Sequence, residues 1–399
     1  MPAQSKARKK AAHKLFLMNR PAHTATASPP SRSHSSFHPV IEDLKVSAYS
    51  VPTEMPESDG TIAWDKTTIV IVEVKSNGER GLGYTYADAS AAKLIADRLA
   101  NVVRRRLVMD IGGCWWAMVA EVRNAGRPGI ASTAISAIDV ALWDLKARLL
   151  HVPLVSLLGS VRDAVPIYGS GGFTSYSIKQ LQSQLSDWAG SGLSMVKMKI
   201  GREPEHDLQR VAAAREAIGS EVQLFVDANG AYSRKQALSF AERFRNYGVR
   251  WFEEPVSSDD LTGLHLLRDR APAEIDIAAG EYGYDTFYFR RMIEAGAVDV
   301  LQADATRCGG ITGFLQAAAL CNAFALPLSA HTAPAIHAHL GCAVKAVRHV
   351  EYFHDHARIE QMFFEGVPKR VIGKLRPDLR QPGMGLELRR ADLNKYAIT

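Results

Sequence analysis

A regular spacing of chemically active side chains constrains the fold of this chain more than any other feature. Between Val196 and Phe353, short apolar segments recur, and each ends on one polar residue: Lys199, Asp227, Glu253, Glu281, Asp304, His331 and Glu351. The steps between these residues are 28, 26, 28, 23, 27 and 20 residues. Stretches of helical pattern separate them, such as residues 207–218 with Gly219 as a stop signal. A buried strand followed by a helix is a βα unit, and a closed ring of such units is a (β/α) barrel. The strand ends of a barrel open on one face, so we expect the seven residues to line one pocket.

Length and composition favour a large globular protein. The chain has 399 residues and 47% hydrophobic content, enough for one large core and a smaller domain. Every long apolar run is interrupted by charge before the roughly 20 residues that a membrane span needs, so we expect no membrane partner. The four cysteines, Cys114, Cys308, Cys321 and Cys342, have no paired spacing. A reduced, cytoplasmic location is the simpler interpretation.

The net charge of +6 belongs to one end of the chain. Residues 1–40 hold seven of the 48 Lys and Arg and none of the 42 acids, which leaves 41 basic and 42 acidic residues for the rest. We therefore predict a disordered basic tail over 1–40, with Met18 as an alternative start, and no nucleic-acid partner for the near-neutral body. The tail lacks the apolar region of a secretory signal.

The remaining chain is predicted to form three parts: an α+β domain over 41–164, a barrel over 165–362, and a segment over 363–399 that packs back on the first domain. Strand patterns in the first domain cover 41–50, 67–74 and 81–86, and helical patterns cover 90–106 and 132–150. Residues 51–65 are predicted to be a mobile loop because they are too polar for a core. We expect this domain to cover the open face of the barrel.

Three carboxylates at consecutive strand ends, Asp227, Glu253 and Glu281, predict a metal site. Hard oxygen ligands without Cys or His favour Mg²⁺ over zinc or copper. Without a cation, burying three carboxylates together would cost many kcal/mol in repulsion and desolvation. Glu254 could replace Glu253, since strand alternation lets only one of the two point inward.

Two candidate bases flank the predicted metal site. Lys197 and Lys199 share one face of their strand, and a second ammonium with a divalent cation should lower the pKa of Lys199 into the range of a base. On the other side, Asp304 can fix the tautomer of His331 and raise its basicity. Structural salt bridges of the lysines and a structural histidine are the alternatives.

Two bases with a divalent metal between them suit the removal of a proton α to a carboxylate. The resulting dianionic enediolate needs strong positive charge, which a metal and a neighbouring Lys supply in a dry pocket. Glu351 would donate a hydrogen bond to the second carboxylate oxygen if its pKa is raised.

Two short motifs each allow two interpretations. GGITG at 309–313 could bind phosphate through its backbone amides or be a tight turn between a strand and a helix. HDHAR at 354–358 could be a metal-binding pair of histidines or a feature of the surface or of a substrate loop.

The motifs together resemble the enolase superfamily, in its mandelate racemase and muconate lactonizing branch. The resemblance rests on AISAIDVALWDLKAR at 134–148, KMK at 197–199, VDAN at 226–229, WFEEP at 251–255, AAGE at 278–281, DATRCGG at 304–310 and SAH at 329–331. It implies an α/β fold, a modified TIM barrel (β/α)₇β with an N-terminal α+β capping domain, and a homo-oligomer. Ala303 stands where many relatives have Pro, and Arg307 where mandelate racemase has Lys.

The resemblance also implies roles for the site residues. It implies one Mg²⁺ per subunit on Asp227, Glu253 and Glu281, catalytic roles for Lys199, Lys197, His331, Asp304 and Glu351, and substrate contacts for Asn229, Lys197 and Glu351. A KxK motif together with a His-Asp dyad is similar to mandelate racemase and to related acid-sugar dehydratases.

Dehydration of a sugar acid to a 2-keto-3-deoxy acid is the leading functional hypothesis. The polar segment 51–65 and the group of Tyr84, Tyr86 and Asp88 favour a polyol substrate, and Tyr84 is the predicted contact. Racemisation or epimerisation of a 2-hydroxy acid is the runner-up, because the same two bases would serve it. Cycloisomerisation needs only one base and ranks third. A non-catalytic binding protein is the most remote alternative, because an idle barrel would not need every ionisable group.

Overall fold

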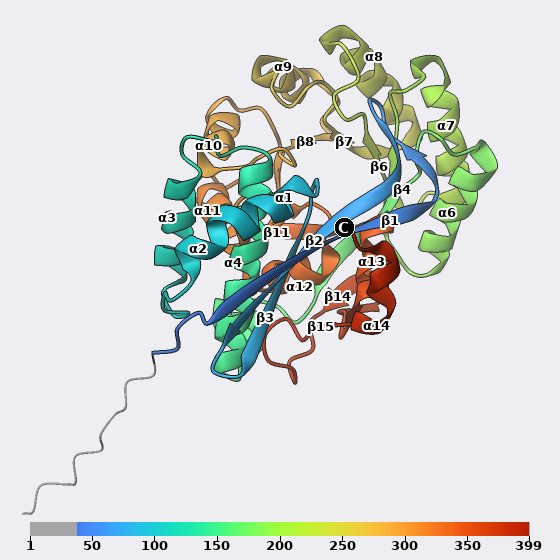
Figure 1. Ribbon diagram of the computed structural model, residues 1–399. Coiled ribbons are helices and arrows are strands. Elements are labelled where there is room, and N and C mark those ends of the chain that lie inside the picture. The colour runs from blue at the N-terminus through green and yellow to red at the C-terminus, as the bar shows by residue number, and fades with distance from the viewer. Residues whose placement is uncertain (1–37, 399) are drawn as a thin grey trace, which may run out of the picture. The chain divides into compact units, whose positions relative to one another are not determined.

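Eight parallel strands close into a barrel in the computed structural model, which describes residues 38–398 (Figure 1). The strands are β4 (Val165–Gly171), β5 (Met195–Lys199), β6 (Gln223–Asp227), β7 (Val249–Glu253), β8 (Asp276–Ala279), β9 (Val300–Ala303), β10 (Leu328–Ala330) and β11 (Val347–Phe353). Each pairs with the next, and β11 pairs with β4 to close the ring. The predicted tail, residues 1–40, lies outside the described residues apart from its last three.

A helix follows each of the first seven barrel strands and covers the outside of the ring. These helices are α6 (Ile178–Gly190), α7 (Pro204–Ile218), α8 (Arg234–Phe244, extended by the 3₁₀ turn η2, Arg245–Tyr247), α9 (Leu261–Arg270), α10 (Thr286–Glu294), α11 (Gly310–Ala323) and α12 (Pro334–Ala343). Capping boxes start two of them, with Ser177 and Gln180 at α6 and Ser233 and Gln236 at α8. The predicted (β/α)₇β arrangement is confirmed.

The inside of the barrel has an apolar floor and a polar mouth. The floor is a cluster of six buried side chains: Tyr168, Met195, Phe225, Trp251, Ala278 and Val300. Alternate residues of a strand point to the same face, so Lys197 and Lys199 follow Met195 inward along β5. The same alternation places Asp227 above Phe225 and Glu253 above Trp251. The polar residues therefore meet at the carboxyl ends of the strands.

An antiparallel sheet and a group of helices form the N-terminal α+β part. The sheet is β1 (Asp43–Ser58), β2 (Ala63–Ser76) and β3 (Glu79–Tyr86). The helical elements are α1 (Ser90–Leu94), the π turn η1 (Ile95–Leu99), α2 (Ala100–Val103), α3 (Ile111–Glu121), α4 (Ile130–Leu149) and α5 (Leu154–Leu158). Helix α4 lies so close to β3 that a Cβ at Gly81 or Gly83 would clash with carbonyl oxygens of the helix. These glycines let the sheet and α4 share one core.

The prediction of a mobile loop over residues 51–65 is wrong. These residues, which we name the cap hairpin, continue β1 to Ser58 and begin β2 at Ala63, with an irregular pairing between Pro52 and Glu57. Val51 and Glu57 are buried. Polarity misled the prediction because the polar groups of the hairpin find hydrogen-bond partners on the barrel, which the local sequence does not reveal.

Helix α4 docks on the start of α11 through side chains of the AISAID segment. Ser136 Oγ accepts hydrogen bonds from the amides of Gly309 and Gly310 at 2.9 and 3.0 Å. Asp139 accepts from the amide of Thr312 at 2.9 Å. Because these amides are already paired within the protein, the GGITG motif is a turn that receives α4 and not a phosphate site.

The C-terminal segment contacts both the barrel and the N-terminal sheet. Its elements are α13 (His354–Phe363), β12 (Phe364–Glu365), β13 (Lys369–Val371), β14 (Lys374–Arg376), β15 (Glu387–Leu388), α14 (Arg390–Leu393) and η3 (Asn394–Tyr396). Strand β14 pairs with β4, and Arg390 pairs with Glu73 of β2. The exact domain boundaries stay a prediction. Among the described helices, none has the length and apolar character that crossing a membrane requires.

Candidate active site

Three buried carboxylates converge at the mouth of the barrel. Asp227 ends β6, Glu253 ends β7, and Glu281 lies two residues after β8. One carboxylate oxygen from each residue lies within 4.8 Å of the others. None of the three is more than 4% exposed. Three adjacent strands thus bring together carboxylates that follow one another at steps of 26 and 28 residues in the sequence.

The donor set of this cluster fits a magnesium ion. All its ligands would be carboxylate oxygens, which Mg²⁺ prefers. Glu281 Oε2 is buried and accepts no hydrogen bond of good geometry, although His331 Nε2 lies 3.1 Å away. A buried oxygen without a hydrogen bond is costly unless a cation or another donor reaches it.

Lys197 and Lys199 approach the carboxylates from β5. Lys197 Nζ lies 2.6 Å from Glu253 Oε1 and 2.8 Å from Glu351 Oε1. Lys199 Nζ lies 2.5 Å from Asp227 Oδ2 and 3.1 Å from Asn229 Oδ1. Lys197 is fully buried, and Lys199 keeps about 6% of its surface exposed at the mouth. Of the two, Lys199 is the one that can reach a bound molecule.

His331 faces the cluster from the opposite side. The ring order of the strands places β6, β7, β8 and β9 between Lys199 on β5 and His331 after β10. His331 Nδ1 lies 2.9 Å from Asp304 Oδ2, which directs Nε2 toward Glu281. Burial alone would lower the pKa of His331, but Glu281 and Glu351 raise it to about 10. The direction agrees with the predicted gain in basicity.

Glu351 does not have the raised pKa that its predicted hydrogen bond to the substrate requires. Burial alone would raise its pKa, but Lys197 and His331 lower it to about 2. The amide of Thr332 also donates to Glu351 Oε2 at 3.1 Å. Glu351 is therefore an ion-pair partner of Lys197 and His331, and a role as a proton-bearing hydrogen-bond donor has no support in this geometry.

The predicted lowering of the Lys199 pKa is not found either. Burial favours the neutral amine, but the carboxylate of Asp227 raises the pKa of Lys199 above its ordinary value. Lys197 acts in the opposite direction. A cation on the three carboxylates would compete with Lys199 for Asp227 and act in the predicted direction.

The two other predicted contact residues differ in position. Asn229 lies at the site, because its side-chain oxygen accepts from Lys199. Tyr84 does not join this cluster: it is fully buried, and its hydroxyl donates to Glu360 Oε1 at 2.5 Å. Its neighbour on the same strand, Tyr86, stacks on His356 with ring centroids 3.4 Å apart. The predicted contact of Tyr84 with substrate has no support here.

Two charged residues that the sequence analysis named without a separate role also lie at the site. Arg307 Nη1 donates to the carbonyl of Glu281 at 3.1 Å, and its Nε lies 3.7 Å from Asp304 Oδ2. Glu254 is buried beside Glu253 with a positive φ of 37° and one unpaired oxygen. Arg307 had been noted only as a departure from mandelate racemase, and Glu254 only as a replacement for Glu253. Strand alternation does not decide between Glu253 and Glu254, because β7 ends at Glu253.

The HDHAR segment joins the barrel to the cap hairpin. His354 lies 3.0 Å from Glu54, and Asp355 accepts from Arg358 and Thr67. His356 is buried against Tyr86. The two histidines contact different partners, so this geometry offers no shared metal site.

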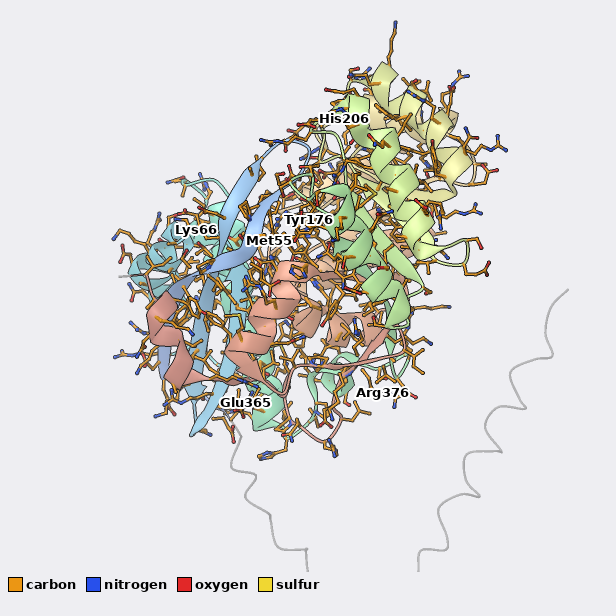
Figure 2. All side chains as sticks on the ribbon, turned by 90° about the vertical axis from the view of Figure 1, so that its right-hand side faces the viewer. Met55, Lys66, Tyr176, His206, Glu365 and Arg376 are labelled. Atoms are coloured by element: carbon orange, nitrogen blue, oxygen red, sulfur yellow. The ribbon has the colours of Figure 1, made fainter. Side chains whose placement is uncertain are left out.

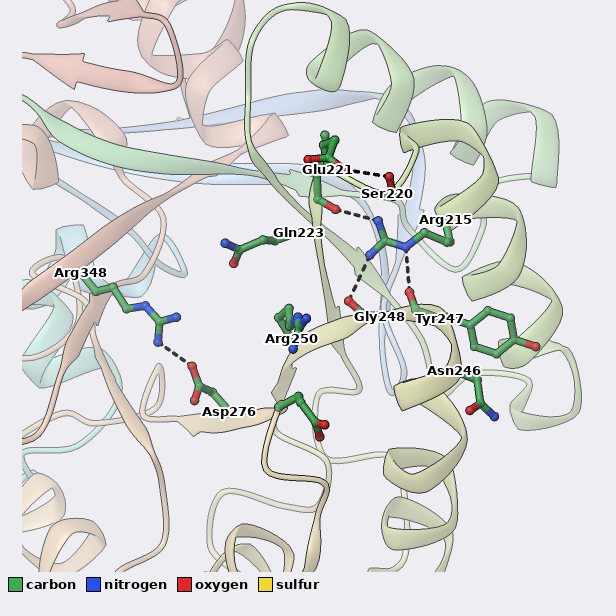
Figure 3. Close-up of a pocket in the computed structure, with 12 residues that line it drawn as sticks. Arg215, Ser220, Glu221, Gln223, Asn246, Tyr247, Gly248, Arg250, Asp276 and Arg348 are labelled. Carbon is green, nitrogen blue, oxygen red and sulfur yellow. Dashed lines mark hydrogen bonds and ion pairs between the residues drawn. The ribbon is translucent and has the colours of Figure 1, made fainter.

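A surface hollow lies at the opposite end of the barrel. It has a volume of about 750 Å³ and is lined by Arg215 of α7 and by residues at the starts of β6, β7 and β8, among them Gln223, Arg250 and Asp276 (Figure 3). Four backbone carbonyls accept from Arg215, and Asp276 pairs with Arg348. Since the amino ends of the strands meet here, the hollow is separate from the carboxylate cluster.

The chain matches two protein-family models. Residues 43–159 match the N-terminal domain of the mandelate racemase/muconate lactonizing enzyme family, and residues 180–392 match the enolase C-terminal domain-like family. Together the two models span most of the residues that form the sheet, the barrel and the carboxylate cluster.

Solved and curated relatives agree with these matches. A mandelate racemase/muconate lactonizing enzyme-like protein from Rubrobacter xylanophilus is 53% identical, with a TM-score of 0.88 over 90% of this chain and 100% of that chain. L-talarate dehydratase from Polaromonas sp. JS666, complexed with Mg and L-glucarate, is 30% identical, with a TM-score of 0.82 over 90% and 98%. D-gluconate dehydratase from Thermoproteus tenax is 28% identical over 363 residues, 86% of this chain and 73% of the relative.

Proposed function

Because this chain belongs to the mandelate racemase and muconate lactonizing enzyme family of the enolase superfamily, we propose that it dehydrates a sugar acid. The product would be a 2-keto-3-deoxy acid, and Mg²⁺ would be the cofactor. The observation that carries the proposal is the position of two bases, Lys199 and His331, on either side of the three-carboxylate cluster. The dehydratases among the relatives support the reaction class.

Different residues of the site would carry out the separate proton transfers of this reaction. A bound Mg²⁺ would polarise the substrate carboxylate and stabilise the negative charge that develops on it. One base, Lys199 Nζ or His331 Nε2, takes the proton from C2. The other base, in its protonated form, gives a proton to the C3 hydroxyl, which leaves as water. Asp304 holds the ring of His331, and Asn229 holds the ammonium of Lys199, so both proton positions are fixed before substrate arrives.

Burial strengthens the electrostatic interactions of the charged groups at the site. Lys197 and Glu351 are almost fully buried, and their salt bridge sits below the two bases. In such a dry site, fixed charges act on the substrate more strongly than they would in water. Lys197 adds positive charge near the place where the substrate carboxylate would lie.

A substrate screen tests the proposal. The protein with Mg²⁺ is incubated with mono- and dicarboxylic sugar acids, and new 2-keto acids are detected with semicarbazide. We expect one acid to give product, EDTA to abolish product formation, and Lys199→Ala and His331→Asn each to lower its rate by about 10²–10⁴-fold. Lys179→Ala and His206→Asn, at exposed positions, are the matched controls and should keep full activity. Product formation that survives EDTA and both base variants would refute the proposal.

Racemisation or epimerisation of a 2-hydroxy acid is the second candidate function. The same arrangement favours it, because bases on both sides of one carbon can exchange its proton without loss of a leaving group. If the screen yields no keto acid but ²H enters C2 of a 2-hydroxy acid in D₂O, this candidate replaces dehydration. A small-molecule acid is the expected partner in either case, and the homo-oligomer and the cytoplasmic location stay predictions.

A further inference from the structure

The cap hairpin lies over one side of the barrel mouth. Its tip, Gly60, is so close to the ends of β5 and β6 that an added Cβ would clash with the carbonyl oxygens of Ile200 and Ala228. Figure 2 shows this side of the molecule, with labels on Met55 of the hairpin and on Tyr176 of the loop after β4. In the ring of eight strands, β8 and β9 lie across from β4 and β5. The loops after β8 and β9 therefore form the other side of the mouth.

A tight turn after β8 fixes Tyr282 beside Glu281 of the carboxylate cluster. The amide of Gly283 donates to the carbonyl of Gly280 at 2.8 Å, so Glu281 and Tyr282 are the two central residues of a four-residue turn. A Cβ at either glycine would clash with neighbouring atoms, the carbonyl oxygen of Gln302 at one end and an aromatic ring at the other. Because the turn is closely packed, its backbone sets the position of Tyr282 relative to Glu281.

Arg307, from the loop after β9, holds the ring of Tyr282. Its guanidinium carbon lies 5.3 Å from the ring centroid, which is within the range of a cation–π contact. The same guanidinium donates from Nη1 to the carbonyl of Glu281 at 3.1 Å, and its Nε lies 3.7 Å from Asp304 Oδ2. Glu281 and Asp304 are also the two partners of His331. The ring is therefore held next to the residues that surround one of the two bases.

Tyr282 is much more open to solvent than its neighbours at the site. It is 38% exposed, whereas Glu281 is 4% and His331 is 6% exposed. The carboxylate of Glu281, followed by burial, raises the pKa of Tyr282 above its ordinary value, which indicates that negative charge lies near the phenol hydroxyl. A phenol hydroxyl is a hydrogen-bond donor as well as an acceptor. Tyr282 thus offers a hydroxyl and a ring face at the rim of the mouth.

The shape of the site determines which part of a substrate could reach this rim. The proposed reaction places the carboxylate at the buried cluster and C2 between the two bases. Apolar side chains such as Phe225 and Trp251 close the barrel below them. The carbon chain beyond C3 must therefore extend toward the rim, where Tyr282 lies. A single exposed aromatic residue is common on protein surfaces, but this one is fixed by a packed turn and a guanidinium at the site.

We propose that Tyr282 binds the substrate, with its hydroxyl donating a hydrogen bond to a substrate hydroxyl on a carbon beyond C3. Arg307 is a positioning residue for the ring. The inference rests on the proposed dehydration and narrows its substrate class to sugar acids that carry a hydroxyl group beyond C3. The shortest such acids have four carbon atoms, so a three-carbon hydroxy acid lacks this contact.

A cycle between one protein hydroxyl and the substrate hydroxyls tests this inference. Wild-type protein and Tyr282→Phe are compared on the identified acid and on its 4-, 5- and 6-deoxy analogues. The phenylalanine keeps the ring and loses only the hydroxyl, so kcat/KM for the full acid should fall by about 2- to 12-fold. On the analogue that lacks the contacted hydroxyl, the two proteins should be equal. No loss on the full acid, or the same loss on every analogue, would overturn the contact and leave dehydration intact.

Calorimetry separates this inference from the reaction itself. Titrations of the same acids in the presence of Mg²⁺ repeat the comparison without turnover. Weaker binding of the acid by Tyr282→Phe would support the contact even if no acid gives a 2-keto product, whereas equal affinity of the two proteins for every acid would overturn it. Tyr247→Phe, in the hollow at the opposite end of the barrel, is the matched control and should change neither affinity nor kcat/KM. A protein that binds none of the acids would refute the proposed function and the inference together.

Discussion

Replacing one glycine at the tip of the cap hairpin should open the hairpin and lower activity. An alanine Cβ at Gly60 would lie 2.8 Å from the carbonyl oxygen of Ile200 and closer still to that of Ala228. Carbon and oxygen atoms normally approach to about 3.3 Å, so the tip would have to move by several tenths of an ångström or more. Both carbonyls belong to the barrel backbone beside Lys199 and Asp227, which cannot yield easily.

The size of the effect follows from the cost of overpacking. Such contacts cost roughly 1–3 kcal/mol, and each 1.4 kcal/mol changes an equilibrium tenfold. The equilibrium constant for docking of the hairpin should therefore fall by about 5- to 150-fold, and the open population should rise by a similar factor. Global stability should change less, because the hairpin can lift from the barrel while β1 and β2 stay paired.

Hydrogen exchange measures this opening without any knowledge of the substrate. Gly60→Ala should speed amide exchange in residues 51–65 and at Thr174, whose amide donates to the hairpin. It should also lower kcat/KM for the substrate that the screen identifies. Gly112→Ala is the matched control, because nothing lies within 4 Å of a Cβ there. Unchanged exchange and kcat/KM within twofold of wild type would refute the close contact.

Three further results are expected. Ser136→Ala leaves two buried amides at the start of α11 without an acceptor, so chemical denaturation should show a loss of about 2–3 kcal/mol, whereas Ser183→Ala, at an exposed position of α6, should show almost none. Burial lowers the pKa of His339 to about 4, so its contribution to stability is complete above the ordinary His pKa of about 6.5 and falls as the pH drops toward 4. Urea unfolding between pH 7.5 and 4.5 should show that the free energy of unfolding falls as the pH drops. His339→Leu should reduce this pH dependence, and His206→Gln, at an exposed position, should not. Saturating Mg²⁺ should stabilise the protein by about 2 kcal/mol, and Glu281→Gln should abolish that gain in thermal melts.

The barrel and its carboxylate cluster were predictable because they follow from a local rule. Each strand is short and apolar, and the polar residue that ends it marks the open face. Asp227 and Glu253 end their strands as predicted, and the predicted helix over residues 132–150 is α4, Ile130–Leu149. These features depend on the order of residues within one βα unit or one helix, so the sequence alone contains them.

The features that escaped prediction depend on contacts between distant segments. The cap hairpin looked like a loop because its partners, such as Thr174, lie more than 100 residues away. The predicted hydrogen bond from Glu351 required a raised pKa, but ion pairs with Lys197 and His331 lower the pKa of this residue. Tyr84 was selected from a cluster of polar residues, and only the fold shows that its hydroxyl is occupied by Glu360. Strand periodicity carries no information about such pairings.

Proton exchange at C2 tests the central claim most directly. Wild-type protein, Lys199→Ala, His331→Asn and the double variant are incubated with Mg²⁺ and the identified acid in D₂O, and NMR follows the C2 proton and the product. Each single variant should lose about 10²–10⁴-fold in turnover, and the double variant should neither exchange the C2 proton nor form product. A double variant that removes the C2 proton at the wild-type rate would contradict the assignment of these two residues as the bases.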